Sequence, residues 1–132
     1  MSRENVEISR RLNEAFNRGD LATVLGLLDP GVEWWDRADD PGATVYRGHD
    51  GYSKHLADID ADVVELQVEI KEVIDAGDYV IAAVRVHGRG RASGAPFEEY
   101  EVHALRFREG KATELREYRT VAEALETLGL WE

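Results

Sequence analysis

Residues 64–71, VELQVEIK, decide the fold class, because apolar and polar side chains alternate along them. A period of two is typical of a β-strand that buries one face. Three more strand-like runs follow at residues 79–89, 97–108 and 112–119. Glycine-containing turns separate these runs, so the sequence predicts that neighbouring strands pair as antiparallel hairpins.

The first half of the chain has a helical period instead. Ile8, Leu12 and Phe16 recur at a spacing that places them on one face of a helix. The expected elements of this half are a long helix, a short helix, a short strand and a third helix, at residues 3–18, 21–28, 32–36 and 50–59.

The C-terminal end predicts one more helix. Thr120 and Glu123 have the spacing of a capping box, which opens a helix. Helices that precede an antiparallel sheet indicate an α+β fold, and no linker divides residues 1–132, so we expect a single domain. A strongly curved sheet wrapped around the N-terminal helices would leave a hollow between them.

Composition limits the partners. The 132 residues carry a formal net charge of −11, with 43% hydrophobic residues and no cysteine. An acidic surface repels phosphate backbones and anionic lipids, so nucleic-acid and membrane partners are not expected. The N-terminal sequence MSRENVEISRR lacks the apolar stretch of a secretory signal, and we expect a cytoplasmic protein.

Three segments carry a resemblance to a known family. They are NEAFNRGDLATVLGLLDPGVEW at 13–34, YRGHDG at 46–51 and HALRFREGKATELREYRTVAEALETLGL at 103–130. Their order and spacing resemble the SnoaL-like proteins of the nuclear transport factor two-like superfamily. The resemblance implies a cone-shaped α+β fold whose curved sheet leads to an apolar pocket. The superfamily includes ketosteroid isomerases, polyketide cyclases, epoxide hydrolases and proteins without catalysis, so the site has to decide the function.

Comparison with ketosteroid isomerases and with SnoaL-type cyclases selects His103. The general base of the isomerases falls on Trp34, and their phenol donor falls on Leu12, so that mechanism is not retained. The acidic group that donates to the oxyanion in the isomerases, and the acid–base aspartate of the cyclases, both fall on His103. A buried histidine with a purely structural hydrogen bond is the alternative.

Comparison with the limonene-type epoxide hydrolases implies a second polar set. It places Arg85, His87, Glu117 and Asp36 where that family has its acids, arginine and water ligand. Epoxide opening needs an acid for the oxygen and a base for the water. The alternatives are a structural ion pair for Arg85, His87 and Glu117, and a loop cap for Asp36.

Strand parity gives two conflicting answers on which side chains face the hollow. The strand register implied by alignment with the family, here called the family register, turns Arg85 and His87 inward. Hydrophobicity alone turns Val84 and Val86 inward instead. Following the family register, we expect Arg85 and His87 inside. The same register leaves Tyr100, Val102 and Ala104 on the outer face of the sheet, where relatives form homodimers.

The resemblance implies a protein that encloses a small, mostly apolar organic molecule and acts on it by acid–base chemistry, without cofactor or metal. His49 and His55 are expected at the surface. If His103 is catalytic, His103→Ala should abolish turnover with little change in melting temperature. The predicted apolar walls are Leu12, Phe16, Trp34, Tyr52 and Leu56.

Two other functions stay open, a non-catalytic binding or accessory module and a dimerisation domain with a filled interior. A cavity far below the usual ~300 Å³ favours the dimerisation domain. An open pocket with His103 within reach of a second titratable group favours the enzyme. Polar groups that only satisfy one another favour the binding module.

Overall fold

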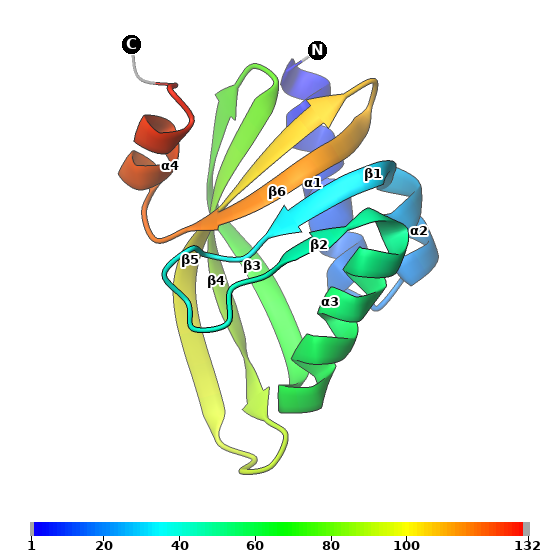
Figure 1. Ribbon diagram of the computed structural model, residues 1–132, viewed down its shortest axis with the longest axis vertical. Coiled ribbons are helices and arrows are strands. Elements are labelled where there is room, and N and C mark those ends of the chain that lie inside the picture. Colours follow the sequence, from blue (N-terminus) through cyan, green and yellow to red (C-terminus); the bar gives the residue numbers. More distant parts are fainter. Residues whose placement is uncertain (1, 131–132) are drawn as a thin grey trace.

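A computed structural model describes residues 2–130 as four helices and six strands (Figure 1). In chain order the elements are α1 (Ser2–Asn17), α2 (Leu21–Leu27), β1 (Leu28–Trp35), β2 (Val45–Arg47), α3 (Gly48–Asp62), β3 (Val63–Ala76), β4 (Tyr79–Gly90), β5 (Pro96–Arg108), β6 (Lys111–Tyr118) and α4 (Val121–Thr127). The α+β prediction is confirmed. Within this part of the chain, no helix is long and apolar enough to cross a bilayer.

The six strands form one curved sheet in the order β2-β1-β6-β5-β4-β3. The predicted antiparallel hairpins of the second half are present, since β3, β4, β5 and β6 pair consecutively and antiparallel. The pair β1–β6 is parallel, which the sequence did not predict. Hairpin turns set the direction of the last four strands, whereas β1 joins the sheet beside a strand far away in the sequence and no turn constrains it.

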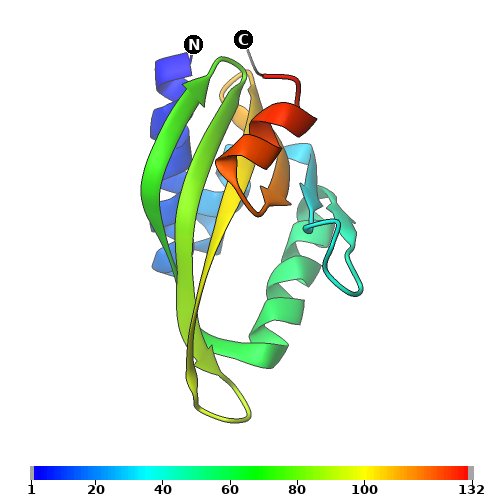
Figure 2. The same cartoon turned by 90° about the vertical axis from the view of Figure 1, so that its left-hand side faces the viewer.

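The two faces of the sheet have separate apolar cores. The concave side packs on α1, α2 and α3 through a cluster that includes Leu12, Ala15 and Phe107. The convex side packs on α4 through Val102 and Ala104, which are 4% and 1% exposed. Figure 2 shows α1 and α4 on opposite sides of the strands.

Helix α4 therefore covers two of the three residues predicted for a dimer face. Only Tyr100 of that set is open to solvent, at 61% exposure. The capping box that opens α4 is present as predicted, because the Thr120 side chain accepts a hydrogen bond from the Glu123 backbone N–H at 3.0 Å. Dimerisation through the remaining outer face stays a prediction.

An irregularity at the start of β3 is held by α1. The register of β3 against β4 shifts between Val64 and Gln67, and Glu65 there has a φ of 57°. The Asn17 side chain accepts from the Val68 N–H at 2.9 Å and donates to the Val68 carbonyl at 2.8 Å. A bulge increases local bending, and this clamp fixes the bent strand against the helix that closes the hollow.

Candidate active site in the hollow of the cone

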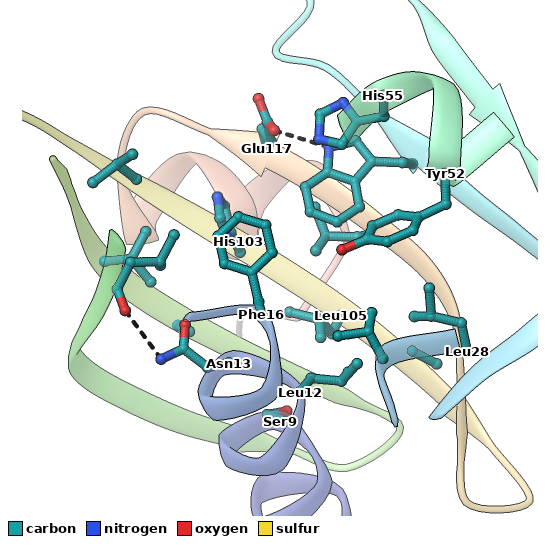
Figure 3. Close-up of a pocket in the computed structure, with 18 of the residues that line it drawn as sticks. Ser9, Leu12, Asn13, Phe16, Leu28, Tyr52, His55, His103, Leu105 and Glu117 are labelled. Atoms are coloured by element: carbon teal, nitrogen blue, oxygen red, sulfur yellow. Dashed lines mark hydrogen bonds between the residues drawn. The ribbon is translucent and has the colours of Figure 1, made fainter. Parts of the chain in front are cut away.

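The concave side of the sheet encloses a cavity of about 140 Å³ (Figure 3). Side chains of α1 and α3 close it on one side, and the inward-facing residues of β1 and β3–β6 close it on the other. Most of these side chains are apolar, and the two carboxyl groups of the lining, Glu101 and Glu117, lie together with His103. An apolar hollow with a few convergent polar groups is typical of a small-molecule site.

Strand pairing explains why these three polar side chains meet. His103 and Glu117 are directly opposite each other on β5 and β6, and Glu101 lies two residues before His103 on the same face. Each offers a ligand or proton-transfer atom within 4.8 Å of the others. Trp34 on β1 donates its indole Nε1–H to Glu117 Oε2 at 2.9 Å and joins them (Figure 3).

His103 and Glu101 form an ion pair away from water. Nε2 of His103 lies 2.8 Å from Oε1 of Glu101, and their side chains are 12% and 15% exposed. Burial opposes the charge on His103, but the hydrogen bond to Glu101 and the charges of Glu101 and Glu117 raise its pKa. Burial also opposes the charge on Glu101, and the His103 partner outweighs it and lowers the pKa of Glu101. Both shifts favour the charged form of the pair.

For the carboxyl group of Glu117, unlike that of Glu101, the effect of burial on the pKa outweighs the effect of the neighbouring partners. Burial raises its pKa from 4.5 to about 7, and the negative charge of Glu101 adds to the increase. The positive charge of His103 and the Trp34 hydrogen bond limit the shift. At neutral pH the carboxyl group of Glu117 is close to half protonated, so it can both take and give a proton.

His55 belongs to this site, although the sequence predicts a surface position. It is 6% exposed, and its ring stacks on Trp34 with 4.3 Å between the ring centroids. Burial, together with the charge of His103, lowers the pKa of His55 to about 4. A neutral imidazole therefore lines the cavity beside the Trp34 ring, in addition to the charged imidazole of His103.

Four of the five predicted apolar wall residues line the cavity, namely Leu12, Phe16, Trp34 and Tyr52. The Trp34 and Tyr52 rings contact each other with centroids 5.6 Å apart. Leu56 does not reach this cavity and instead lines a separate groove beside α3.

The prediction that Arg85 and His87 face the hollow is wrong. Their neighbours Val84 and Val86 line the cavity instead. Arg85 lies on the outer face, where its Nε contacts Glu98 at 2.7 Å and its Nη1 lies 3.6 Å from Glu69. The alignment of β4 with the family assumes a one-residue difference in the loop. A shift of one residue turns every side chain of a strand to the opposite face, which explains the error. On β5 the same register is correct, because Glu101 and His103 point inward.

Within residues 2–130, Asp36 is not one of the residues that line the cavity. Its carboxylate accepts a hydrogen bond from the Thr44 backbone N–H at 3.2 Å, and its own N–H donates to the Thr44 carbonyl at 3.1 Å. These contacts close the loop between β1 and β2, which is the capping alternative. Burial raises the pKa of Asp36, and its charge adds to the negative potential near Glu117.

The three polar groups also have the donor types of a metal site. One imidazole and two carboxylates could hold a divalent cation such as Zn²⁺. A cation bound there would replace the proton between His103 and Glu101 and break their hydrogen bond. The geometry fits an ion pair with one separate carboxyl group more closely, since the two partners are already in hydrogen-bond contact.

His55 and Glu101 belong to the site but were not among the candidates predicted from the sequence. A pattern in the sequence nevertheless points to each of them. Tyr52, His55 and Ile59 follow helical spacing and all line the cavity, so the period of α3 places His55 inside. Glu101 shares a strand face with His103, and the same parity that selects one selects the other.

The SnoaL-like domain family matches residues 9–115 of this chain. Among solved structures, an NTF2-like protein of unknown function from Burkholderia pseudomallei K96243 is 24% identical, with a TM-score of 0.80 over 93% of this chain and 95% of that one. An NTF2-like protein from Burkholderia xenovorans LB400 is 26% identical, with a TM-score of 0.73 over 89% and 90%.

TerC, co-crystallised with polyporic acid, is 22% identical, with a TM-score of 0.79 over 96% of this chain and 98% of that one. No match was found among proteins with curated functions. The family match spans the helices that close the hollow and most of the sheet that forms it. The chain belongs to the SnoaL-like domain family, within the NTF2-like fold.

Proposed function

We propose that this protein binds a small, uncharged organic molecule in its cavity and catalyses a proton transfer on it, with Glu117 as the acid–base group. One observation carries the proposal: a buried carboxyl group with a pKa of about 7 faces an apolar cavity, beside a charged histidine. Perturbed titratable groups of this kind cluster at active sites. The ligand of TerC, polyporic acid, is an organic molecule as well, which supports an organic occupant.

The cavity volume sets the size of the reacting group. At about 140 Å³ the cavity lies below the usual range of ligand pockets, which alone would favour a dimerisation domain. An apolar cavity of roughly 150 Å³ is nevertheless large enough to bind benzene. A single six-membered ring therefore fits next to Glu117, and the small volume limits the size of the ligand without excluding one.

Isomerisation beside a carbonyl group illustrates the chemistry. The Glu117 carboxylate takes a proton from the carbon next to the carbonyl, and the C–H electron pair forms an enolate. Charge on the enolate oxygen is stabilised electrostatically by the imidazolium of His103. The protonated Glu117 then returns the same proton to another carbon, so atoms and charge balance and no cofactor takes part.

Turnover of one-ring probes tests this function. We expect the protein to convert cyclohex-3-en-1-one into its conjugated isomer, with an increase in absorbance as the readout. Because the base is the ionised form of Glu117, kcat/KM should rise with pH and reach half its maximum near pH 7. Cyclohexene oxide serves as the second probe: water attacks a ring carbon as the C–O bond breaks, protonated Glu117 gives its proton to the oxygen, and the proton that the water loses restores Glu117. The rate of this reaction should fall as the pH rises through 7.

Failure of both probes to react faster than in buffer would count against catalysis on a one-ring molecule. A rate independent of pH between 5 and 9 would remove Glu117 from the mechanism.

One observation favours a non-catalytic binding module as the second candidate. The three convergent groups Glu101, His103 and Glu117 already have partners within the chain, since His103 pairs with Glu101 and Glu117 accepts from Trp34. Under this alternative, a ring-sized ligand binds in the cavity with the same affinity at pH 5 and pH 9 and is released unchanged.

A further inference from the structure

A second hollow adjoins the cavity, because several side chains line both. It is a groove of about 380 Å³ lined by residues of α1, α2, α3 and the beginning of β3. Its surface is mainly apolar and includes Leu21, which is 41% exposed, and Leu56. We call this groove the outer groove and the 140 Å³ cavity the inner cavity.

The two hollows share one wall. The side chains that line both are Phe16, Val24, Tyr52, Ile59 and Leu66. These largely apolar side chains separate the two spaces, and Phe16 is half-buried, so it packs less tightly than a core aromatic residue. A half-buried side chain of this kind changes rotamer more readily than a tightly packed core residue. The polar residues Glu101, His103 and Glu117 line the inner cavity and not the outer groove.

The acidic residues at the rim of the outer groove are neutralised. Each of them forms an ion pair with an arginine at 3.3 Å or less: Asp20 with Arg18, Asp60 with Arg91, and Glu65 with Arg89. Within residues 2–130, the rim therefore offers no unpaired acidic group to a charged ligand, and the floor of the groove is apolar. An uncharged, apolar occupant suits such a surface best.

We propose that the inner cavity and the outer groove form one two-chamber site for an elongated, uncharged molecule. Its polar ring occupies the inner cavity beside Glu117, and an apolar tail passes Phe16 into the outer groove. This inference rests on the proposed function only for the position of the ring, because the tail is recognised by binding and not by chemistry. It predicts a substrate larger than the inner cavity alone would hold.

A homologous series of ligands tests the two-chamber site. Phenol and its para-ethyl, para-butyl and para-hexyl derivatives are titrated into the full chain at pH 6.5, with calorimetry as the readout. Each methylene group buried in the outer groove should increase the affinity about fourfold, so the affinity should rise steadily along the series. Phenol itself should bind weakly, in the inner cavity alone.

Variants separate the two chambers. Leu56→Asn and Leu21→Asn place a polar group in the outer groove and should reduce the gain per methylene while leaving phenol affinity unchanged. If Leu56→Asn does not fold, Leu21→Asn takes its place. Leu21 is 41% exposed, so its replacement should not affect folding. Tyr100→Ser, an exposed aromatic on the opposite face, is the matched control and should retain the full gain.

The outcomes distinguish this inference from the proposed function. Phenol binding with no gain along the series, or a gain that both groove variants retain, would overturn the two-chamber site and leave the role of Glu117 intact. A gain that persists in Glu117→Gln, together with lost turnover, supports both. If not even phenol binds, the inner cavity is not a ligand site, and the two-chamber site and the proposed function are both wrong.

Discussion

Replacing Glu117 by glutamine should lower kcat for the ketone isomerisation by about 10²–10⁴-fold, because removal of a positioned general base costs an effect of this size. Glutamine has nearly the same shape and can still accept the hydrogen bond from Trp34 Nε1, so the cavity keeps its walls. The measurement is the initial rate at pH 8, where wild-type Glu117 is ionised. A variant that keeps more than about half of the wild-type rate would exclude Glu117 as the base.

Stability provides the control for this variant. The pKa of Glu117 is raised to about 7 in the folded chain, so the folded state binds the proton more tightly than the unfolded state does. Stability from this group is therefore full below pH 4.5 and is lost as the pH rises through 7. We expect Glu117→Gln to match the wild type at pH 4.5 and to be more stable at pH 8, by up to about 3 kcal/mol. Loss of activity in a stabilised variant cannot be attributed to unfolding.

Replacing His103 by alanine should destabilise the fold by about 3–5 kcal/mol at pH 6, since it leaves the buried carboxylate of Glu101 without its partner. In a chain of this length the loss corresponds to roughly 10–20 °C in melting temperature. The sequence comparison alone predicts that this substitution abolishes turnover and spares stability. The geometry instead predicts that turnover and stability are lost together, because the same imidazole forms the ion pair and faces the cavity.

A second substitution isolates the ion pair. In the His103→Ala background, Glu101→Gln removes the unpaired charge and should recover part of the lost stability. Thermal unfolding of the wild type, both single variants and the double variant gives the coupling between the two side chains. A His103→Ala variant that melts within about 2 °C of the wild type would show that the pair contributes little.

The fold could be predicted from the sequence because its signals are local. Alternation along residues 64–71 and helical spacing along Ile8, Leu12 and Phe16 depend only on which face of an element is buried. The parallel pairing of β1 with β6 depends on contacts between distant segments, and no spacing within either strand records it. The same limit applies to α4, whose packing on the outer face covers two predicted dimer residues.

The candidate site could be predicted only in part. His103 and Glu117 are found by resemblance and face the cavity, since the family register holds on β5 and β6. It fails on β4, where the hydrophobic signal of Val84 and Val86 is the correct guide and Arg85 lies outside. A half-buried strand is read more safely from its own apolar residues than from a distant alignment with a loop difference.

The pKa of Glu117 lies beyond what the sequence can give. Its value depends on burial, on the charges of Glu101 and His103, and on the Trp34 hydrogen bond, which come from different strands. No spacing pattern encodes their sum. This is why Glu117 is only one of several polar candidates in the sequence, whereas the structure distinguishes it as a buried carboxyl group whose pKa is raised to about 7.

A carbon-13 NMR titration of the Glu117 side-chain carboxyl group, assigned by its absence in Glu117→Gln, tests the proposed chemistry most directly. We predict a midpoint near pH 7, far above the ordinary 4.5 of a glutamate. A midpoint near 4.5 would mean that the carboxylate stays ionised at neutral pH. Glu117 could then not serve as the proton donor at neutral pH, and the pH dependence predicted for both probe reactions would be contradicted.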